Sequence, residues 1–563
     1  MLLQNGWICP MDDSGQEFPD GWLLVRDGLV DAVGGGAAPA AEVVVDVGGA
    51  VVTPGLVNTH HHLYQTLTRA RAQEATLFEW LRELYPVWAR IDAEAEYAAA
   101  RTGLAELALS GCTTVFDHHY VFPRGRDGLW EAEVQAAREL GVRIVASRGS
   151  MDLGESDGGL PPDSLVESID EVLAETERLA GLQDGDGMVQ LAVAPCSPFS
   201  VTKELMLESA ELARRLGLRL HTHLAETVEE NAYCRELYGC RPVEYLEELG
   251  WVAGDVWCAH CVHLSPDDVG SFGRAGVGVA HCPTSNLRLG AGVAPVRDLV
   301  DAGAPVGLGV DGSASNERSD LFLEVKQALL VARGRGGPQA MTVREALRLG
   351  TRGGAAVLGR EDVGELSPGK RADVAVWRTD GLELGAPRST RLRGWCCRRR
   401  TASTDSTSAA RRSSATAASY GRTRPRSPAS TASGRSGWRN SSDRLKPVAA
   451  SRRSQTSGRP GKIAHVISTH VLDTELGGPG AGIKVGLFRG QELISLQETN
   501  EDGRIPDLSE GQSLGPGQYR LVFYVDSGFF EKVEATIVLE PGRDHYHVPL
   551  LLSPYQCTIY RGS

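Results

Sequence analysis

No stretch of this chain is apolar enough to cross a membrane. Its apolar runs fall short of the roughly 18 residues that a spanning helix needs. The N-terminus lacks the charged and then apolar segments of a secretion signal. The 11 cysteines are scattered without the spacing of a disulfide scaffold. These absences predict no membrane partner. They also predict a cytoplasmic location, because cysteines in the cytoplasm are typically reduced.

An excess of positive charge is also lacking over most of the chain. The formal net charge is −14, which argues against nucleic acid as a partner. The 563 residues are 42% hydrophobic, which is enough for sizeable cores. This length suggests about three or four domains, or fewer if one of them is a barrel.

Residues 388–460 differ in composition from the rest. They hold 17 Arg and 1 Lys against 2 Asp, a net charge of +16, so the rest of the chain carries −30. Only Leu392, Leu445 and Val448 supply aliphatic side chains larger than alanine. Such a segment cannot bury enough apolar surface to offset the entropy lost on ordering. The composition predicts a disordered, low-complexity basic segment.

Three explanations of this segment stay open. It is a true linker in a bifunctional enzyme, or a basic arm for RNA or a membrane, or the product of a frameshift near residues 386–390 that fuses two reading frames. Few aromatic residues interrupt the basic ones, which argues against nucleic acid. A back-translation with chosen G/C third bases, read one base earlier, permits a strand-like and then a helix-like ending. This back-translation is a construction, because the third bases are assumed.

Residues 1–387 alternate between strand-like and helix-like stretches. Eight apolar, β-branched runs are mostly separated by helix-like segments such as residues 205–216 and 320–333. Eight such units predict an α/β fold, a (β/α)₈ barrel, with a small β-domain before it. The eight runs are residues 51–57, 113–117, 142–147, 189–195, 218–224, 256–259, 277–280 and 306–310.

Three consecutive histidines follow the first of these runs. Side chains alternate along a strand, so His60 and His62 point one way and His61 the other. At the C-terminal end of a barrel strand, one of these sets faces the mouth, where barrel enzymes keep their chemistry. An His-x-His pair alone is a weak signal, and a core or capping role is the alternative.

Other strand ends carry matching residues. The fifth run ends in His221-Thr-His223 and is followed by Glu226, the sixth ends before His260, the seventh before His281, and the eighth before Asp311. Packing alone does not account for histidines and a carboxylate at five strand ends. Nitrogen ligands combined with a carboxylate suit Zn²⁺ or Fe²⁺.

The chain here resembles the amidohydrolase superfamily, in its mononuclear deaminase branch. The motifs that carry the resemblance are residues 54–62 (Pro-Gly-Leu-Val-Asn-Thr-His-His-His), 221–226, 259–264, 281–287 and 310–312. The resemblance implies a metal held by His60, His62, His223 and Asp311, with Glu226 as proton carrier and His260 as an active-site helper. His61 remains a structural residue, and the role of His281 stays open.

The chemistry implied is hydrolytic deamination. A bound metal lowers the pKa of water towards about 7 and so supplies hydroxide at neutral pH. Asp311 accepts the water proton, hydroxide attacks the amidine-like carbon of a heterocycle, and Glu226 protonates the ring nitrogen before ammonia leaves. Loops at residues 63–70, 147–153, 157–162 and 194–200 resemble those of 8-oxoguanine deaminases, whose product is urate. Guanine or triazine deaminases, and a non-catalytic scaffold, are the alternatives.

The last 100 or so residues predict an all-β sandwich, with strands at residues 484–489, 518–525, 532–539 and 546–552. Residues 467–474, 499–504, 546–554 and the final Tyr560-Arg-Gly-Ser563 resemble 5-hydroxyisourate hydrolase, the enzymatic relative of transthyretin. The resemblance implies catalytic His470, Arg504, His547 and Ser563, a homotetramer and no cofactor.

Both halves then act on purine-derived small molecules, since urate is oxidised to 5-hydroxyisourate. If the frameshift is real, only the C-terminal hydrolase is secure, because the barrel loses its usual ending. The predicted domains are residues 1–50 (small β-domain), 51–358 (barrel), 359–387 (return strands of the small β-domain), 388–461 (basic linker) and 462–563 (hydrolase).

Overall fold

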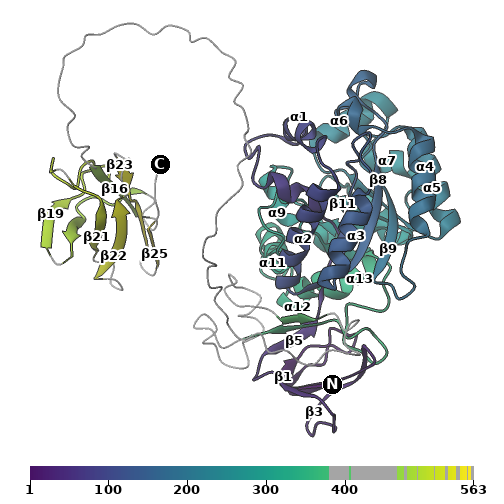
Figure 1. Cartoon of the computed structure of the whole chain (residues 1–563), viewed down its shortest axis with the longest axis horizontal. Coiled ribbons are helices and arrows are strands. Elements are labelled where there is room, and N and C mark those ends of the chain that lie inside the picture. The colour runs from purple at the N-terminus through teal and green to yellow at the C-terminus, as the bar shows by residue number, and fades with distance from the viewer. Residues whose placement is uncertain are drawn as a thin grey trace, which may run out of the picture. The chain divides into compact units, whose positions relative to one another are not determined.

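The computed structural model (Figure 1) divides into two compact units, Met1–Thr423 and Arg424–Ser563. Each is considered by itself. The structure describes residues 1–378, 405–407, 466–473, 478–490, 492–512, 514–525, 531–539, 545–553 and 556–559.

The first unit contains the predicted barrel. Eight parallel strands close in the order β10-β11-β12-β13-β6-β7-β8-β9, and each of the eight predicted runs contributes one strand to this barrel. The fold-class prediction is confirmed. The strands are β6 (Leu56–Asn58), β7 (Cys112–Asp117), β8 (Arg143–Ser150), β9 (Val189–Pro195), β10 (Arg219–Leu224), β11 (Val256–His260), β12 (Gly278–His281) and β13 (Val306–Leu308).

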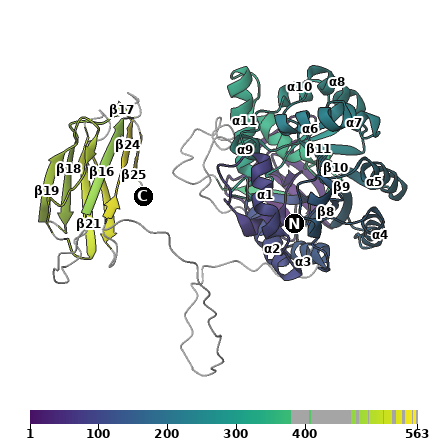
Figure 2. The ribbon, with the colours of Figure 1, turned by 90° about the horizontal axis from the view of Figure 1, so that it is seen from above.

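Helices surround these strands, as the view from above shows (Figure 2). The helix of residues 203–216 illustrates why they form: the Thr202 side chain accepts a hydrogen bond from Leu205 N, and Gly217 ends the helix at φ 68°. The helices are α1 (Leu77–Trp88), α2 (Ala93–Leu109), α3 (Leu129–Leu140), α4 (Ile169–Ala180), α5 (Lys203–Leu216), α6 (Val228–Tyr238), α7 (Pro242–Glu248), α8 (Pro266–Ala275), α9 (Pro283–Arg288), α10 (Val296–Asp301), α11 (Leu321–Gly336), α12 (Val343–Arg348) and α13 (Gly354–Val357). Shorter turns are η1 (Leu63–Thr68), η2 (Glu155–Asp157), η3 (Asp163–Leu165) and η4 (Leu349–Gly353).

Residues 51–57, predicted as one barrel strand, form two strands in two different sheets. Residues 51–54 join the small β-domain, and residues 56–58 join the barrel. The break falls at Pro54-Gly55, where proline has no amide hydrogen for a ladder and a side chain on Gly55 would collide with Thr113. The single-strand prediction is therefore wrong in detail.

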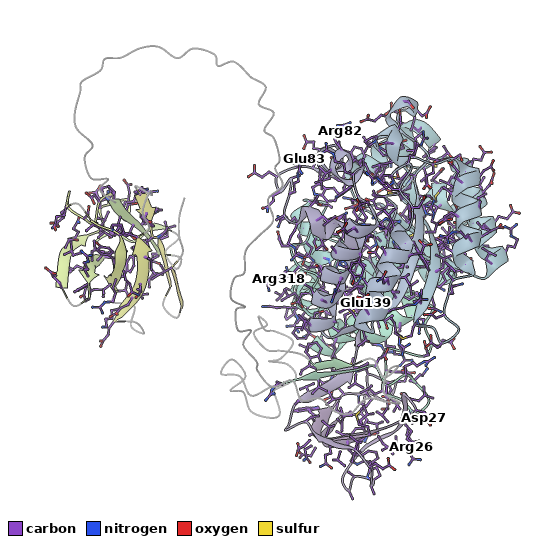
Figure 3. All side chains as sticks on the ribbon, in the orientation of Figure 1. Arg26, Asp27, Arg82, Glu83, Glu139 and Arg318 are labelled. Carbon is purple, nitrogen blue, oxygen red and sulfur yellow. The ribbon has the colours of Figure 1, made fainter. Side chains whose placement is uncertain are left out.

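The small β-domain is one sheet with the order β15-β14-β5-β1-β2-β3, and β4 pairs with β1. In Figure 3, Arg26 and Asp27 of this domain lie at the opposite end of the unit from Arg82 and Glu83 of α1. Its strands are β1 (Leu2–Ile8), β2 (Phe18–Arg26), β3 (Leu29–Gly35), β4 (Val44–Asp46), β5 (Val51–Pro54), β14 (Val374–Trp377) and β15 (Asp405–Thr407).

The chain returns to this sheet after the barrel. Residues 374–377 pair antiparallel with residues 51–54, and the neighbouring Asp373 forms a buried ion pair with Arg143 of β8. Residues 405–407, which lie within the segment predicted to be disordered, pair with β14. The rest of the basic segment, residues 388–404 and 408–461, lies outside the described residues.

The second unit is the predicted all-β fold. One sheet contains β16 (Val466–Asp473), β17 (Gly478–Pro479), β20 (Arg504–Ile505), β23 (His545–His547), β24 (Leu550–Ser553) and β25 (Gln556–Ile559). The other has the order β19 (Glu492–Glu498), β18 (Lys484–Arg489), β21 (Gly517–Tyr524), β22 (Lys532–Leu539). Alternate residues Tyr519, Leu521 and Phe523 enter its apolar core. The predicted strand 546–552 is divided at Pro549, which cannot donate to a ladder.

Across the described residues of both units, no helix combines the length and the hydropathy that crossing a membrane requires.

Candidate active sites

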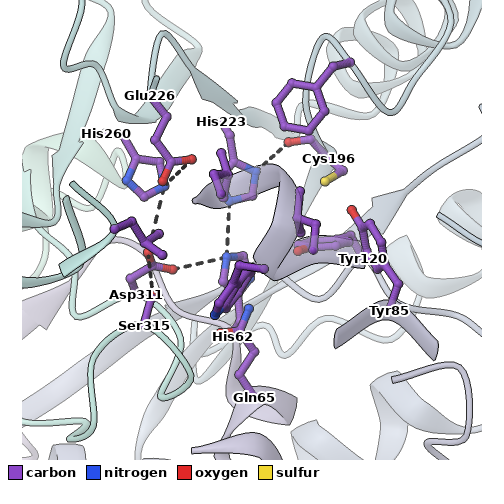
Figure 4. Close-up of a pocket in the computed structure, with 15 residues that line it drawn as sticks. His62, Gln65, Tyr85, Tyr120, Cys196, His223, Glu226, His260, Asp311 and Ser315 are labelled. Atoms are coloured by element: carbon purple, nitrogen blue, oxygen red, sulfur yellow. Dashed lines mark hydrogen bonds and ion pairs between the residues drawn. The ribbon is translucent and has the colours of Figure 1, made fainter. Parts of the chain in front are cut away.

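Four metal-binding groups meet at the C-terminal ends of three barrel strands. His60 and His62 follow β6, His223 is in β10 and Asp311 follows β13. Asp311 Oδ1 lies 3.5 Å from His60 Nε2 and 3.3 Å from His62 Nε2. His62 Nε2 lies 3.2 Å from His223 Nε2 (Figure 4). The structure therefore brings together all four residues that the sequence predicted as ligands.

Backbone carbonyls determine which nitrogen of each histidine carries its hydrogen. His62 Nδ1 lies 2.7 Å from the His118 carbonyl, and His223 Nδ1 lies 2.6 Å from the Cys196 carbonyl. A carbonyl oxygen only accepts, so each Nδ1 donates and each Nε2 presents a lone pair. Two lone pairs 3.2 Å apart repel unless a cation lies between them. The donor set therefore fits a divalent metal.

His60 is oriented by a chain of two further groups. His221 Nδ1 donates to the Trp257 carbonyl at 3.0 Å, which leaves His221 Nε2 to accept from His60 Nδ1 at 3.0 Å. His60 Nε2 is then bare, fully buried and without a hydrogen-bond partner. Such outer partners fix ligand orientation in metal sites. No role was predicted for His221 from the sequence; its two-residue spacing from His223 was the available signal.

His61 points away from this group, as strand alternation predicts. Its Nε2 lies 2.9 Å from Ser319 Oγ, and its Nδ1 lies 4.0 Å from Asp117 Oδ1. Burial lowers its pKa to about 3, so the ring is neutral.

Two ionisable groups, Glu226 and His260, lie beside Asp311. Glu226 Oε2 lies 3.6 Å from His260 Nε2, and His260 Nε2 lies 3.9 Å from Asp311 Oδ2. Burial raises the pKa of Glu226 to about 7. Burial alone would lower the pKa of His260, but the charges of Glu226 and Asp311 outweigh it and raise that pKa. His260 Nδ1 faces Asn286 Oδ1 at 2.8 Å, so Nδ1 donates and Nε2 faces the two carboxylates.

The backbone is strained where these groups are presented. Ala225, His260 and Asp311 all have positive φ, at 50°, 69° and 61°. Glu230 supports the first of them, since its carboxylate accepts hydrogen bonds from Ala225 N and Glu226 N at 2.8 and 2.9 Å. Left-handed non-glycine residues are uncommon and concentrate at functional sites.

His118 is a site residue that the sequence reasoning missed. It directly follows β7, and its ring stacks on that of His223 with centroids 4.7 Å apart. Its Nε2 donates to the Ala194 carbonyl at 2.9 Å, and one of its ring nitrogens lies within 4.8 Å of ligand atoms of His60, His62 and His223. The signal was its position directly after the second strand run. His281 is buried with its pKa lowered to about 3 by burial, and no metal group of the described residues includes it.

A cavity opens beside these groups. Among the described residues, the buried Trp80 Nε1 and Gln65 Oε1 on its wall have no hydrogen-bond partner. One is a donor and the other an acceptor, so both can contact a flat polar ring. The cavity is lined by His62, Gln65, Leu77, Trp80, Leu81, Tyr85, Tyr120, Cys196, Phe199, His223, Glu226, His260, Leu289, Asp311 and Ser315.

Comparison with known proteins agrees with this geometry. Residues 51–404 match the Amidohydrolase family. The chain belongs to the amidohydrolase family. The domain is 50% identical over 372 residues to an 8-oxoguanine deaminase of Pseudomonas aeruginosa, covering 65% of this chain and 83% of that one. It is 40% identical over 405 residues to an isoxanthopterin deaminase of an unknown prokaryote, covering 67% and 83%.

The amidohydrolase domain also resembles solved structures. An atrazine chlorohydrolase from Arthrobacter aurescens TC1, complexed with zinc, matches with a TM-score of 0.66 and 34% identity, over 69% of this chain and 90% of that one. This half of the chain is a deaminase-type amidohydrolase, a hydrolase that acts on C–N bonds. The prediction of an enzyme is confirmed.

A second group of residues meets in the C-terminal unit. His470 of β16 pairs with Arg504 of β20, and Ser468 pairs with His547 of β23. Ser468 Oγ lies 2.8 Å from both His547 Nδ1 and His545 Nε2. Burial and the nearby charge of Arg504 lower the pKa of His547. The imidazole of His547 is therefore neutral at physiological pH, the form needed in a general base.

Residues 467–562 match the HIUase/Transthyretin family, so the chain carries one domain of each family. Three of the four residues predicted for this second site, His470, Arg504 and His547, lie together. Ser563 lies outside the described residues.

Proposed function

We propose that the amidohydrolase domain deaminates 8-oxoguanine to urate, and that the C-terminal domain hydrolyses 5-hydroxyisourate to 2-oxo-4-hydroxy-4-carboxy-5-ureidoimidazoline. The deaminase assignment rests on one observation: His62 Nε2 and His223 Nε2 present facing lone pairs beside the buried carboxyl of Glu226. The 50% identity to an 8-oxoguanine deaminase supports this substrate over a triazine. Guanine remains the alternative, because it shares the ring system.

The metal is Zn²⁺ or Fe²⁺, held by His60, His62, His223 and Asp311. Three imidazole nitrogens and one carboxylate are a ligand set for both ions. When bound, the ion supplies hydroxide at neutral pH and polarises the substrate. A zinc-bound relative with the same fold supports zinc as the first choice.

The side chains around the metal site accept and donate the protons of the reaction. Asp311 Oδ1 faces the ligand nitrogens, and its Oδ2 accepts from Ser285 Oγ at 2.6 Å, which holds the carboxylate as an anion able to take a proton. Glu226, with its pKa near 7, gives a proton to the ring nitrogen beside the attacked carbon. His260, between the two carboxylates, orients the reacting oxygen by its Nε2.

Product assays with three candidate substrates test the substrate assignment. The full chain, loaded with zinc, is offered 8-oxoguanine, guanine and a hydroxytriazine separately, and urate, xanthine and ammonia are measured. We expect urate and ammonia from 8-oxoguanine, with a kcat/KM higher than for the other two. A preference for guanine or the triazine contradicts the assignment, while ammonia from none of them contradicts deamination.

In the C-terminal domain, His470 and His547 activate water, Arg504 binds the anionic ring, and Ser563 completes the site. A neutral histidine can remove a proton from water as a general base. This domain assembles as a homotetramer. Fresh 5-hydroxyisourate decays spontaneously, so the test is an enzyme-dependent increase in its decay rate. The mass of the complex in solution tests the homotetramer.

We also propose that the domain boundaries are those predicted from the sequence and that the protein is cytoplasmic. We infer a frameshift near residues 386–390, supported by the loss of apolar residues from the point where the barrel family continues with strands and a helix. Sequencing the genomic DNA across codons 380–465 tests it. A single missing or extra base that restores the apolar pattern supports the frameshift, and an unchanged frame favours a true linker.

A further inference from the structure

A second cluster of metal-binding side chains is formed by the helices α2 and α3 and the segment that follows β7. Glu96 is on α2, Glu133 is on α3, and His119 follows β7. One ligand atom of each lies within 4.8 Å of the others. All three side chains are completely buried. We call these three residues the α2–α3 cluster.

The carboxylates of the α2–α3 cluster lack partners. In the part of the chain that the structure describes, neither oxygen of Glu96 and neither oxygen of Glu133 has a hydrogen-bond partner. Among the same described residues, no lysine or arginine forms an ion pair with either carboxylate, and Glu96 has only His119 within ion-pair distance. Asp117 lies next to them, and its Oδ2 is also without a hydrogen-bond partner. An unpaired buried carboxylate destabilises the fold, so negative charge here needs compensation.

His119 presents a lone pair to this negative charge. Its Nε2 lies 2.9 Å from the Val121 carbonyl, which only accepts, so Nε2 carries the hydrogen and Nδ1 is bare. Nδ1 faces Glu96 Oε1 at 3.6 Å and has no hydrogen-bond partner. Two acceptors that face each other require either a proton or a cation between them.

The distance favours a cation over a proton. A shared proton holds its two heavy atoms about 2.5–3.2 Å apart, and this separation is longer. Two ligand atoms about 2.0–2.2 Å from a tetrahedral Zn²⁺ lie about 3.3–3.6 Å apart, which matches the 3.6 Å between His119 Nδ1 and Glu96 Oε1. One imidazole and two carboxylates suit a first-row transition-metal ion.

We propose that Glu96, His119 and Glu133 bind a second divalent transition-metal ion, separate from the catalytic one. The ion ties α2 and α3 to the end of β7. It also compensates the charge of Asp117, whose Oδ1 accepts from Leu63 N at 2.7 Å directly after His62. The second ion is therefore structural, and it stabilises the strand ends that carry the catalytic ligands.

Metal content tests this site. The full chain is produced in zinc-supplemented medium and desalted without chelator, and all divalent metals are counted by mass spectrometry. We expect two equivalents per chain in the wild type and one in the Glu96→Gln/Glu133→Gln variant. The matched control is Glu94→Gln, an exposed residue on the same helix, which should retain two.

A second variant guards against misfolding of the first. His62→Ala/His223→Ala removes two catalytic ligands and leaves the α2–α3 cluster intact, so it should retain one equivalent. Anomalous diffraction from wild-type crystals at the zinc edge should show a peak between Glu96, His119 and Glu133. One equivalent in the wild type with no peak at this position overturns the proposal, as does a metal content in Glu96→Gln/Glu133→Gln equal to that of wild type.

Discussion

His62 Nε2 and His223 Nε2 lie 3.2 Å apart, and the hydrogens of both rings are on the opposite nitrogens, donated to backbone carbonyls. The backbone directly after β7 and β9 thus decides the tautomers before any ion binds. Two histidines from strands on different sides of the barrel are preorganised as metal ligands, and the cost of orienting them is met on folding.

Removal of one of these ligands should reduce metal binding at the catalytic centre. We expect His223→Ala to lose at least about 10- to 100-fold in affinity for zinc, since even outer-shell changes cost that much. Deamination should fall in parallel and recover only partly at high zinc. Zinc titration followed by activity provides the measurement, and unchanged affinity would contradict the assigned ligand set.

Replacement of Glu226 should stop the chemistry and leave binding intact. Glu226→Gln keeps the shape but cannot release a proton, and a positioned acid or base contributes about 10²–10⁴-fold. We expect kcat to fall by that factor with KM and zinc content nearly unchanged. Glu229→Gln, an exposed neighbour on α6, is the control. Equal losses in both variants would show a structural effect instead.

The activity should fall on the alkaline side of neutrality. Burial raises the pKa of Glu226 to about 7, so the protonated acid predominates below that pH and is lost above it. A divalent cation nearby favours the carboxylate, so the fall should begin no higher than about pH 7. A profile of kcat/KM against pH measures this. Activity that keeps rising well above pH 8 would show that the proton comes from another group.

The ion pair between Arg143 and Asp373 should be important for stability. The side chains are 1% and 3% exposed, and Arg143 Nε lies 2.6 Å from Asp373 Oδ2. Breaking a buried pair costs about 3–5 kcal/mol because one charge stays uncompensated. We expect Asp373→Asn to lower the free energy of unfolding of the first unit by that amount. Asp255→Asn, which breaks the exposed pair with Arg214, should cost about 0–1 kcal/mol; denaturant titration distinguishes them.

A substitution in the C-terminal active site should reduce hydrolysis of 5-hydroxyisourate without changing deamination by the amidohydrolase domain. Because Arg504 is exposed and its backbone pairs with β16, Arg504→Ala should leave the fold intact. We expect enzyme-dependent decay of 5-hydroxyisourate to fall by about 10²-fold or more while deamination is unchanged, as for a lost charged contact of about 2–3 kcal/mol. Circular dichroism checks the fold. Normal hydrolysis by this variant would remove Arg504 from the site.

Periodicity in the sequence predicted most of the fold. The eight runs gave the eight barrel strands, because parallel strands buried on both faces are continuous apolar stretches. The periodicity did not reveal that residues 51–54 and 56–58 belong to different sheets. Pro54 and Gly55 mark a break in the strand, but they do not indicate which strands the residues before and after the break pair with. Pro549 is a similar case in the second unit.

For the sites, the sequence by itself determined which residue types stand at the strand ends: His60, His62, His223 and Asp311 were found there. Only the tertiary structure decided what completes them. His118 and His221 acquire their positions beside His223 and His60 through contacts between strands far apart in the chain. Glu96, His119 and Glu133 come from a helix, a strand end and another helix with no common spacing. A local pattern fixes the direction of a side chain, whereas the partners it meets depend on how the barrel closes.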